Sequence, residues 1–137
     1  MVSTKSRDRS EQPPARWPAA PETVLLARRR AASLLDADRH VPSVTRADVL
    51  LVVSELVSNA VRHGVGPVEF GLDVGAAQVH IEVGDQGPSR PEPARRPAAT
   101  SQNGRGLLIV DAIASAWGVT AHDPGKTVWA DVALPKR

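Results

Sequence analysis

The hydrophobic period of the chain changes at Gly66-Pro67, and this change constrains the fold more than any other feature of the sequence. Before it, from about Arg46 to His63, apolar residues recur at the three- and four-residue spacing of a helix. After it, the stretches "VEFGLDV" and "VHIEV" alternate apolar and polar residues, as strands with one buried face do. With Gly75 in the turn between them, these two strands predict an antiparallel hairpin.

The other segments extend this pattern. The stretch from Pro21 predicts a first helix, and Thr45 is a candidate N-cap of the second helix, which Gly64 ends. A third helix is expected from Arg105 to Trp117, and a second hairpin is expected to turn at residues 123–125. The expected class is α+β, with three helices on one face of a mostly antiparallel sheet.

Length and composition narrow the possible functions. A chain of 137 residues fits one domain, which we expect over residues 16–137, after a polar, disordered tail over residues 1–15. The absence of cysteine excludes a disulfide framework and a thiolate zinc site. The net charge of +2 comes from basic residues concentrated in residues 1–30, so we expect no direct nucleic-acid binding. No apolar run is long enough for a membrane span, and we expect a cytoplasmic protein.

A row of polar side chains lies along the second predicted helix. Glu55, Asn59 and His63 are spaced by four residues, so they share one side of the helix. A carboxylate and an amide oxygen at this spacing can serve a hydrated Mg²⁺ ion, and the carboxylate can accept a proton from an attacking hydroxyl. The same residues can equally be a surface charge, a solvated amide and a cation at the end of the helix.

Three short stretches carry further candidate sites. In "GDQGP", Asp85 ends a strand, where its carboxylate can accept the amine of adenine or simply form a turn. In "NGRGL", two glycines precede a helix, where backbone N–H groups can bind phosphate or the segment can be a hinge. The stretch "PGKT" opens the last strand and is at least a hairpin turn.

The order "ELVSNAVRHG", "DQGP", "GRGL", "GKT" resembles the N, G1, G2 and G3 boxes of the GHKL ATP-binding superfamily, which includes the histidine kinases. Within it, the chain is similar to the small serine kinases that act as anti-sigma factors, the RsbW and SpoIIAB type. The resemblance covers about Trp17 to Leu134 and implies a Bergerat-type two-layer α/β sandwich. Ser89 replaces the second glycine of the usual G1 box.

The resemblance also implies roles for individual residues. Asn59 corresponds to the Mg²⁺ ligand and Glu55 to the general base, while His63 is within reach of phosphate or is structural. Asp85 corresponds to the carboxylate that reads adenine, and Gly87 lets the base approach. The remaining ATP-binding positions implied are Gly104, Arg105, Gly106 and Leu107 in the G2 box and Thr127 in the G3 box, with residues 88–103 as the ATP lid.

The function implied is that of a protein serine/threonine kinase using ATP and Mg²⁺. Its substrate would be a STAS-domain anti-anti-sigma protein, and it would also sequester a sigma factor, most simply as a homodimer. The alternative is an ATP-binding module of the same fold that acts by partner binding without transferring phosphate. Retention of Glu55 favours the kinase.

Overall fold

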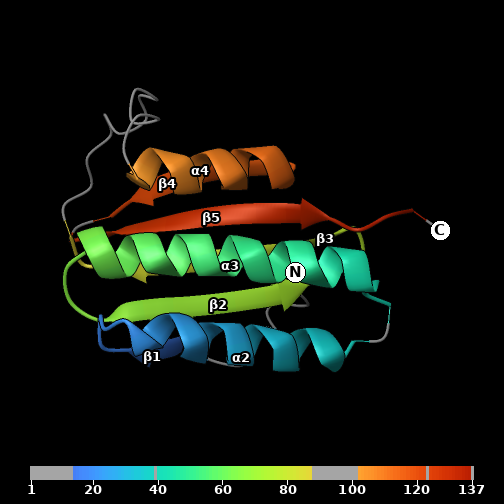
Figure 1. Cartoon of the computed structure of the whole chain (residues 1–137), viewed down its shortest axis with the longest axis horizontal. Helices are drawn as coiled ribbons and strands as arrows, with labels where there is room; N and C mark the ends of the chain where they lie inside the picture. The colour runs from blue at the N-terminus through green and yellow to red at the C-terminus, as the bar shows by residue number, and fades with distance from the viewer. Residues whose placement is uncertain (1–13, 39, 88–101, 123, 137) are drawn as a thin grey trace, which may run out of the picture.

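The computed structural model describes residues 14–38, 40–87, 102–122 and 124–136 (Figure 1). The α+β class expected from the sequence is confirmed, because the described helices accompany a sheet in which every neighbouring pair of strands is antiparallel. In chain order the elements are β1 (Ala15–Trp17), α2 (Glu22–Asp36), α3 (Ser43–His63), β2 (Val68–Val74), β3 (Gln78–Asp85), α4 (Gln102–Ile113), β4 (Ala116–Ala121) and β5 (Lys126–Ala133).

The strands form one five-stranded sheet in the order β1-β2-β3-β5-β4, and every neighbouring pair is antiparallel. The predicted first hairpin is confirmed, because β2 pairs with β3 from Val74 opposite Val79 to Glu69 opposite Gly84. In the centre of the sheet, β3 pairs with β5 along its whole length, which ends with Asp85 opposite Lys126.

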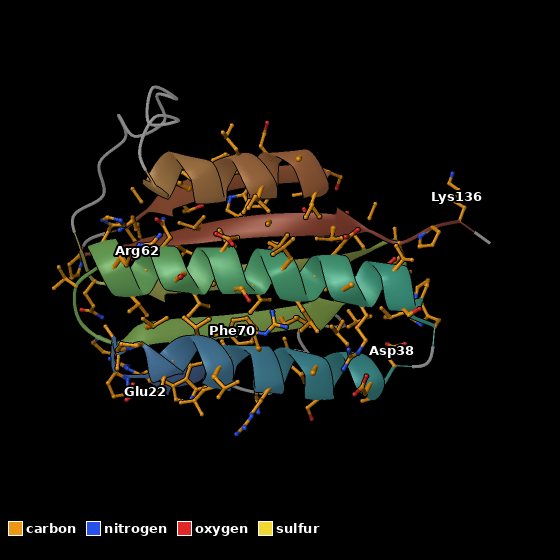
Figure 2. All side chains as sticks on the ribbon, in the orientation of Figure 1. Glu22, Asp38, Arg62, Phe70 and Lys136 are labelled. Atoms are coloured by element: carbon orange, nitrogen blue, oxygen red, sulfur yellow. The ribbon has the colours of Figure 1, made fainter. Side chains whose placement is uncertain are left out.

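The helices form a second layer on one face of the sheet, with α3 between α2 and α4 (Figure 1). Apolar side chains of α3 and of the inward-facing strand positions meet between the layers, where Phe70 is buried (Figure 2). The two-layer arrangement follows from the apolar stripe on each helix, which needs a matching apolar sheet face to cover it. None of the described helices is both long and apolar enough to span a bilayer.

Polar contacts hold α2 against α3. The Arg28 guanidinium donates hydrogen bonds to the backbone oxygen of Leu50, at 3.2 Å, and to the hydroxyl of Ser54, at 2.7 Å. The side of α3 that carries Ser54 therefore faces α2.

The first two boundaries differ from the expectation. Helix α3 begins at Ser43, because the N–H of Arg46 already bonds the oxygen of Pro42 at 2.9 Å. Thr45 is consequently a buried residue inside the helix and not its N-cap. Ala15, which we assigned to the tail, lies in β1, a strand of only three residues that is too short to give a periodic pattern. Trp17 of this strand stacks on Phe70, with ring centroids 6.1 Å apart.

The third helix also differs at both ends. Helix α4 begins at Gln102 and ends at Ile113, whereas we expected it from Arg105 to Trp117. The chain leaves the helix when Ser115 donates its N–H to the oxygen of Asp131 at 2.8 Å, and Trp117 then lies in β4. Packing against the sheet edge outweighs the helical period of this segment, which had suggested one more turn.

Candidate functional site

The site is built around Asp85, the last residue of β3. Val79, Ile81 and Val83 of this strand point into the core, and the two-residue period places the Asp85 side chain on the same face. The carboxylate is only 3% exposed. A buried carboxylate needs hydrogen-bond donors, because water cannot solvate it.

Two donors satisfy this carboxylate. The N–H of Gly87 donates to Asp85 Oδ1 at 2.7 Å, as in a turn in which the side chain bonds its own backbone two residues on. The ammonium of Lys126 lies 3.1 Å from Oδ1 and 3.0 Å from Oδ2. Lys126 is placed there by the sheet register, in which it stands directly opposite Asp85.

Three glycines allow other backbone segments to approach Asp85. A Cβ atom on Gly64, the residue after α3, would lie 2.6 Å from the Asp85 Cγ atom. A Cβ atom on Gly87 would lie 3.0 Å from Asp85 Oδ1, and one on Gly125 would lie 2.4 Å from the Asp85 backbone oxygen. Gly125 also has a φ of 101°, a conformation that side chains disfavour. Glycine therefore occupies three positions at which the backbone passes close to this carboxylate.

The end of α3 is tied to the end of β3. The N–H of Gln86 donates to the oxygen of Val65 at 2.8 Å, and Gly66, with a φ of 75°, turns the chain toward β2. As a result, the last residues of α3 and β3 and the first residues of β5 share one end of the molecule, the end at which α4 begins (Figure 1).

The polar row predicted on α3 leads to this end. Glu55 and Asn59 are half-buried and His63 is exposed. Because successive helical residues are rotated by about 100°, Glu55 and Asn59 lie on the side of α3 away from Ser54 and α2, which is the side of α4. No hydrogen bond or ion pair joins the Glu55 or Asn59 side chain to another described residue. Their oxygens are thus available to a ligand.

The G2 positions lie within α4 and not in the junction before it. Helix α4 begins at Gln102, so the backbone of residues 104–107 is helical, and Leu107 is half-buried. Ser89 and most of the expected lid, residues 88–101, lie outside the described residues. Helix α4 begins at the same end of the molecule at which β3 ends (Figure 1).

A buried Asp at a strand end, glycines around it and a polar helix row beside it agree with the match of a protein-family model. The model of the histidine kinase-like ATPase domain matches residues 17–132. This chain belongs to the histidine kinase-like ATPase domain family. No curated protein matches the sequence.

A solved structure with this fold is a histidine kinase domain of a blue-light activated histidine kinase from Erythrobacter litoralis. It is 23% identical to this histidine kinase-like ATPase domain, with a TM-score of 0.54. The similarity covers 77% of this chain and 60% of that one. It shows a shared fold, which confirms the expected architecture.

One G3 position of this histidine kinase-like ATPase domain is corrected by the structure. Thr127 stands opposite Gly84, so its side chain lies on the sheet face away from Asp85, where its hydroxyl is 2.9 Å from His122 Nε2. The side chain that faces Asp85 is that of Lys126, which we had not assigned. Lys126 lies two residues before Val128 and four before Ala130, so strand alternation places the three side chains on one face of β5. This spacing was the signal in the sequence that could have identified Lys126.

The described residues offer few protein donors for the Mg²⁺ ion that is expected in this family. No cluster of three or more His, Asp or Glu residues that could hold an ion occurs among the described residues. Mg²⁺ commonly keeps several waters and takes one or two protein oxygens together with substrate phosphates. The Asn59 amide oxygen, with Glu55 one turn away, suits that mode of binding.

Proposed function

We propose that the chain binds Mg·ATP with the adenine at Asp85 and transfers the γ-phosphoryl group to a serine of a STAS-domain anti-anti-sigma protein. In the same proposal the unphosphorylated STAS protein holds the kinase, and its phosphorylation releases the kinase to sequester a sigma factor. The kinase acts as a homodimer in the cytoplasm. The proposal combines membership of the histidine kinase-like ATPase domain family with the resemblance of the motifs to anti-sigma serine kinases.

The surroundings of Asp85 are the observation that carries the nucleotide part of this proposal. A carboxylate with 3% exposure is costly in a protein core, and three glycines keep side chains away from it. The other core-facing positions of this strand are apolar, at Val79, Ile81 and Val83, so the carboxylate is an exception on this face. A carboxylate held in this way is suited to accept a hydrogen bond from the 6-amino group of adenine.

The polar row on α3 supports the transfer part. From Gly64, beside Asp85, Asn59 lies about 7–8 Å back along the helix and Glu55 about 13–14 Å back. Going back along the helix from the base contact at Asp85, the amide of Asn59 comes first and the carboxylate of Glu55 second. This order matches a nucleotide whose base lies at Asp85 and whose phosphates extend along α3 and the start of α4.

The reaction asks little covalent chemistry of the protein. In the proposed step, the serine oxygen bonds to the γ-phosphorus, the bond from that phosphorus to the β–γ bridging oxygen breaks, and ADP leaves with that electron pair. Glu55 accepts the serine proton. Asn59 would hold Mg²⁺, which neutralises phosphate charge when bound, and the backbone N–H groups at the start of α4 would orient the phosphates.

Calorimetric titration with ATP and Mg²⁺ tests the binding step. We expect one site in the wild type and loss of measurable binding in Asp85→Asn, because the variant loses the charged acceptor. Asp131→Asn is a matched control, because Asp131 lies on the opposite sheet face, in a contact with His80. The absence of heat and of a thermal shift at millimolar ATP in the wild type would remove the nucleotide proposal.

Radiolabelled ATP with candidate STAS proteins tests the transfer step. We expect label on a serine of one STAS partner only when the kinase is present. If the wild type binds ATP but labels none of them, the chain is a binding module that acts by sequestering its partner.

A further inference from the structure

Lys126 lies beside Asp85, the residue at which the adenine is proposed to bind. We propose that Lys126 is a specificity-determining residue, which donates a hydrogen bond to the ring nitrogen N1 of adenine while Asp85 accepts one from the 6-amino group. This inference rests on the proposed function, since it assigns a second contact within the same ATP site.

Each partner of the Asp85–Lys126 ion pair has one hydrogen-bonding group that the pair does not use. A carboxylate has about four acceptor sites. Oδ1 of Asp85 uses two of them, for Gly87 N–H and Lys126, and Oδ2 uses one, for Lys126. An ammonium has three donors, of which Lys126 spends two on Asp85. One acceptor site at Oδ2 and one donor on Lys126 therefore remain side by side.

Adenine presents the complementary pair. Its 6-amino group is a donor and the adjacent N1 is an acceptor. A Cβ atom on Gly64 would lie 2.8 Å from Oδ2, so the glycine keeps a side chain from covering this oxygen.

The ammonium is also the more accessible half of the pair. The Lys126 side chain is 22% exposed and that of Asp85 is 3% exposed, so an incoming base edge meets Lys126 first. We expect the pair to stay together when the base binds, because the two opposite charges attract each other at 3.0 Å and the base uses only the acceptor site and the donor that the pair leaves free. Both residues lie on paired strands, which hold their backbones in fixed register.

A lysine at this position imposes a condition that a hydroxyl would not. A hydroxyl can donate or accept, whereas an ammonium only donates. Ring position 1 must therefore be an acceptor, as in adenine. In hypoxanthine that position carries a hydrogen and position 6 carries an oxygen, so both contacts would be reversed.

The experiment compares ATP with 1-deaza-ATP, in which a C–H group replaces N1, by calorimetry in the presence of Mg²⁺. We expect the wild type to bind 1-deaza-ATP about tenfold or more weakly than ATP, as hydrogen bonds from charged groups contribute. In Lys126→Met the two affinities should become nearly equal. Lys136→Met is the control, because Lys136 lies at the opposite end of the molecule (Figure 2), and it should keep the wild-type ratio.

Each result decides between the two proposals. If the wild type does not bind ATP, the proposed function fails. If it binds ATP but the ratio of affinities is the same in the wild type and Lys126→Met, the assignment of Lys126 is wrong while the function stands. Tighter ATP binding by Lys126→Met would mean that the ammonium competes with the base for Asp85, and equal affinity for ATP and ITP would mean that this edge is not read as proposed.

A second measurement does not depend on the folding of a variant. With nitrogen-15-labelled ATP bound to the wild type, the N1 resonance should move upfield, as expected when N1 accepts a hydrogen bond. An N1 resonance that is unchanged on binding would overturn the inference even if Lys126→Met does not fold.

Discussion

The backbone at Gly64 lies against the carboxylate of Asp85, so that a Cβ atom on Gly64 would be 2.6 Å from Asp85 Cγ and 2.8 Å from Oδ2. The φ of Gly64 is −87°, which any residue can adopt, so the glycine is required by this contact and not by its own conformation. The contact couples the end of α3 to the position of the carboxylate.

Gly64→Ala should therefore displace Asp85 or the end of α3. We expect the free energy of unfolding to fall by about 1–3 kcal/mol, as for other overpacked sites, and the affinity for ATP to fall as well. Chemical denaturation and calorimetry measure the two effects. Gly71→Ala is the matched control, because a Cβ atom on Gly71 meets nothing within 4 Å. Equal behaviour of the two variants would show that the Gly64–Asp85 contact is unimportant.

Two glycines with positive φ should differ in their tolerance of alanine. At Gly125 the φ is 101° and a Cβ atom would lie 2.4 Å from the rigid backbone oxygen of Asp85. At Gly66 the φ is 75° and the nearest atom, at 3.0 Å, belongs to the flexible Gln86 side chain. We expect Gly66→Ala to cost about 1 kcal/mol and Gly125→Ala to cost more, with strain alone contributing about 1–3 kcal/mol. Thermal unfolding of both variants gives the order, and the reverse order would contradict the described turn geometry.

Glu55 and Asn59 should separate chemistry from binding. Glu55→Gln keeps the shape of the side chain but cannot accept the proton, so phosphoryl transfer should fall about a hundredfold or more while ATP still binds. Asn59→Ala should weaken Mg·ATP binding as well as transfer. Glu22→Gln, in the first turn of α2, is the control for the loss of a carboxylate. A normal transfer rate in Glu55→Gln would mean that this carboxylate is only a helix surface charge.

Stability should fall as the pH rises from about 6.5 to about 9, because of His80 on the sheet face away from the helices. Its ring bonds Glu82 at 2.9 Å and Asp131 at 2.6 Å, and these carboxylates outweigh burial and raise the His80 pKa from 6.5 to about 9. Asp73 stands opposite His80 in the register and adds a third carboxyl group nearby. The stability that these bonds contribute is fully present below the pKa of His80 in the unfolded chain. It is lost as the pH rises through the pKa of His80 in the folded protein.

The melting temperature as a function of pH measures this effect. His80→Gln should flatten the decline between these two pH values, whereas His122→Gln, outside this cluster, should keep it. The bond to His80 also lowers the pKa of Glu82, so a second loss of stability is expected in acid, as the pH falls below 4.5 through the folded pKa of Glu82. A wild-type melting temperature that stays constant between pH 6.5 and 9 would contradict the described cluster.

Local patterns predicted the long elements and part of the site. The apolar spacing of α3 placed its C-terminus at His63, and alternation identified β2 and β3. The positions of Glu55 and Asn59 on one side of α3 and of Asp85 at the end of β3 follow from the same periods. These features depend on neighbours a few residues away, so the order of the residues is enough to specify them.

The partner of Asp85 was decided only by the tertiary structure. "GKT" offers Lys126 and Thr127 at adjacent positions, and the two alternate between the faces of β5. A change of register by one residue exchanges the two faces, and the register depends on how the turn at Gly125 meets the end of β3. The start of α4 and the pairing of β1 likewise depend on contacts with segments far away in the chain. The sequence by itself thus determined the helices, the central strands and the carboxylate of the site. The contact between Lys126 and Asp85 came from long-range pairing, because only the assembled sheet specifies which residue of β5 stands opposite the end of β3.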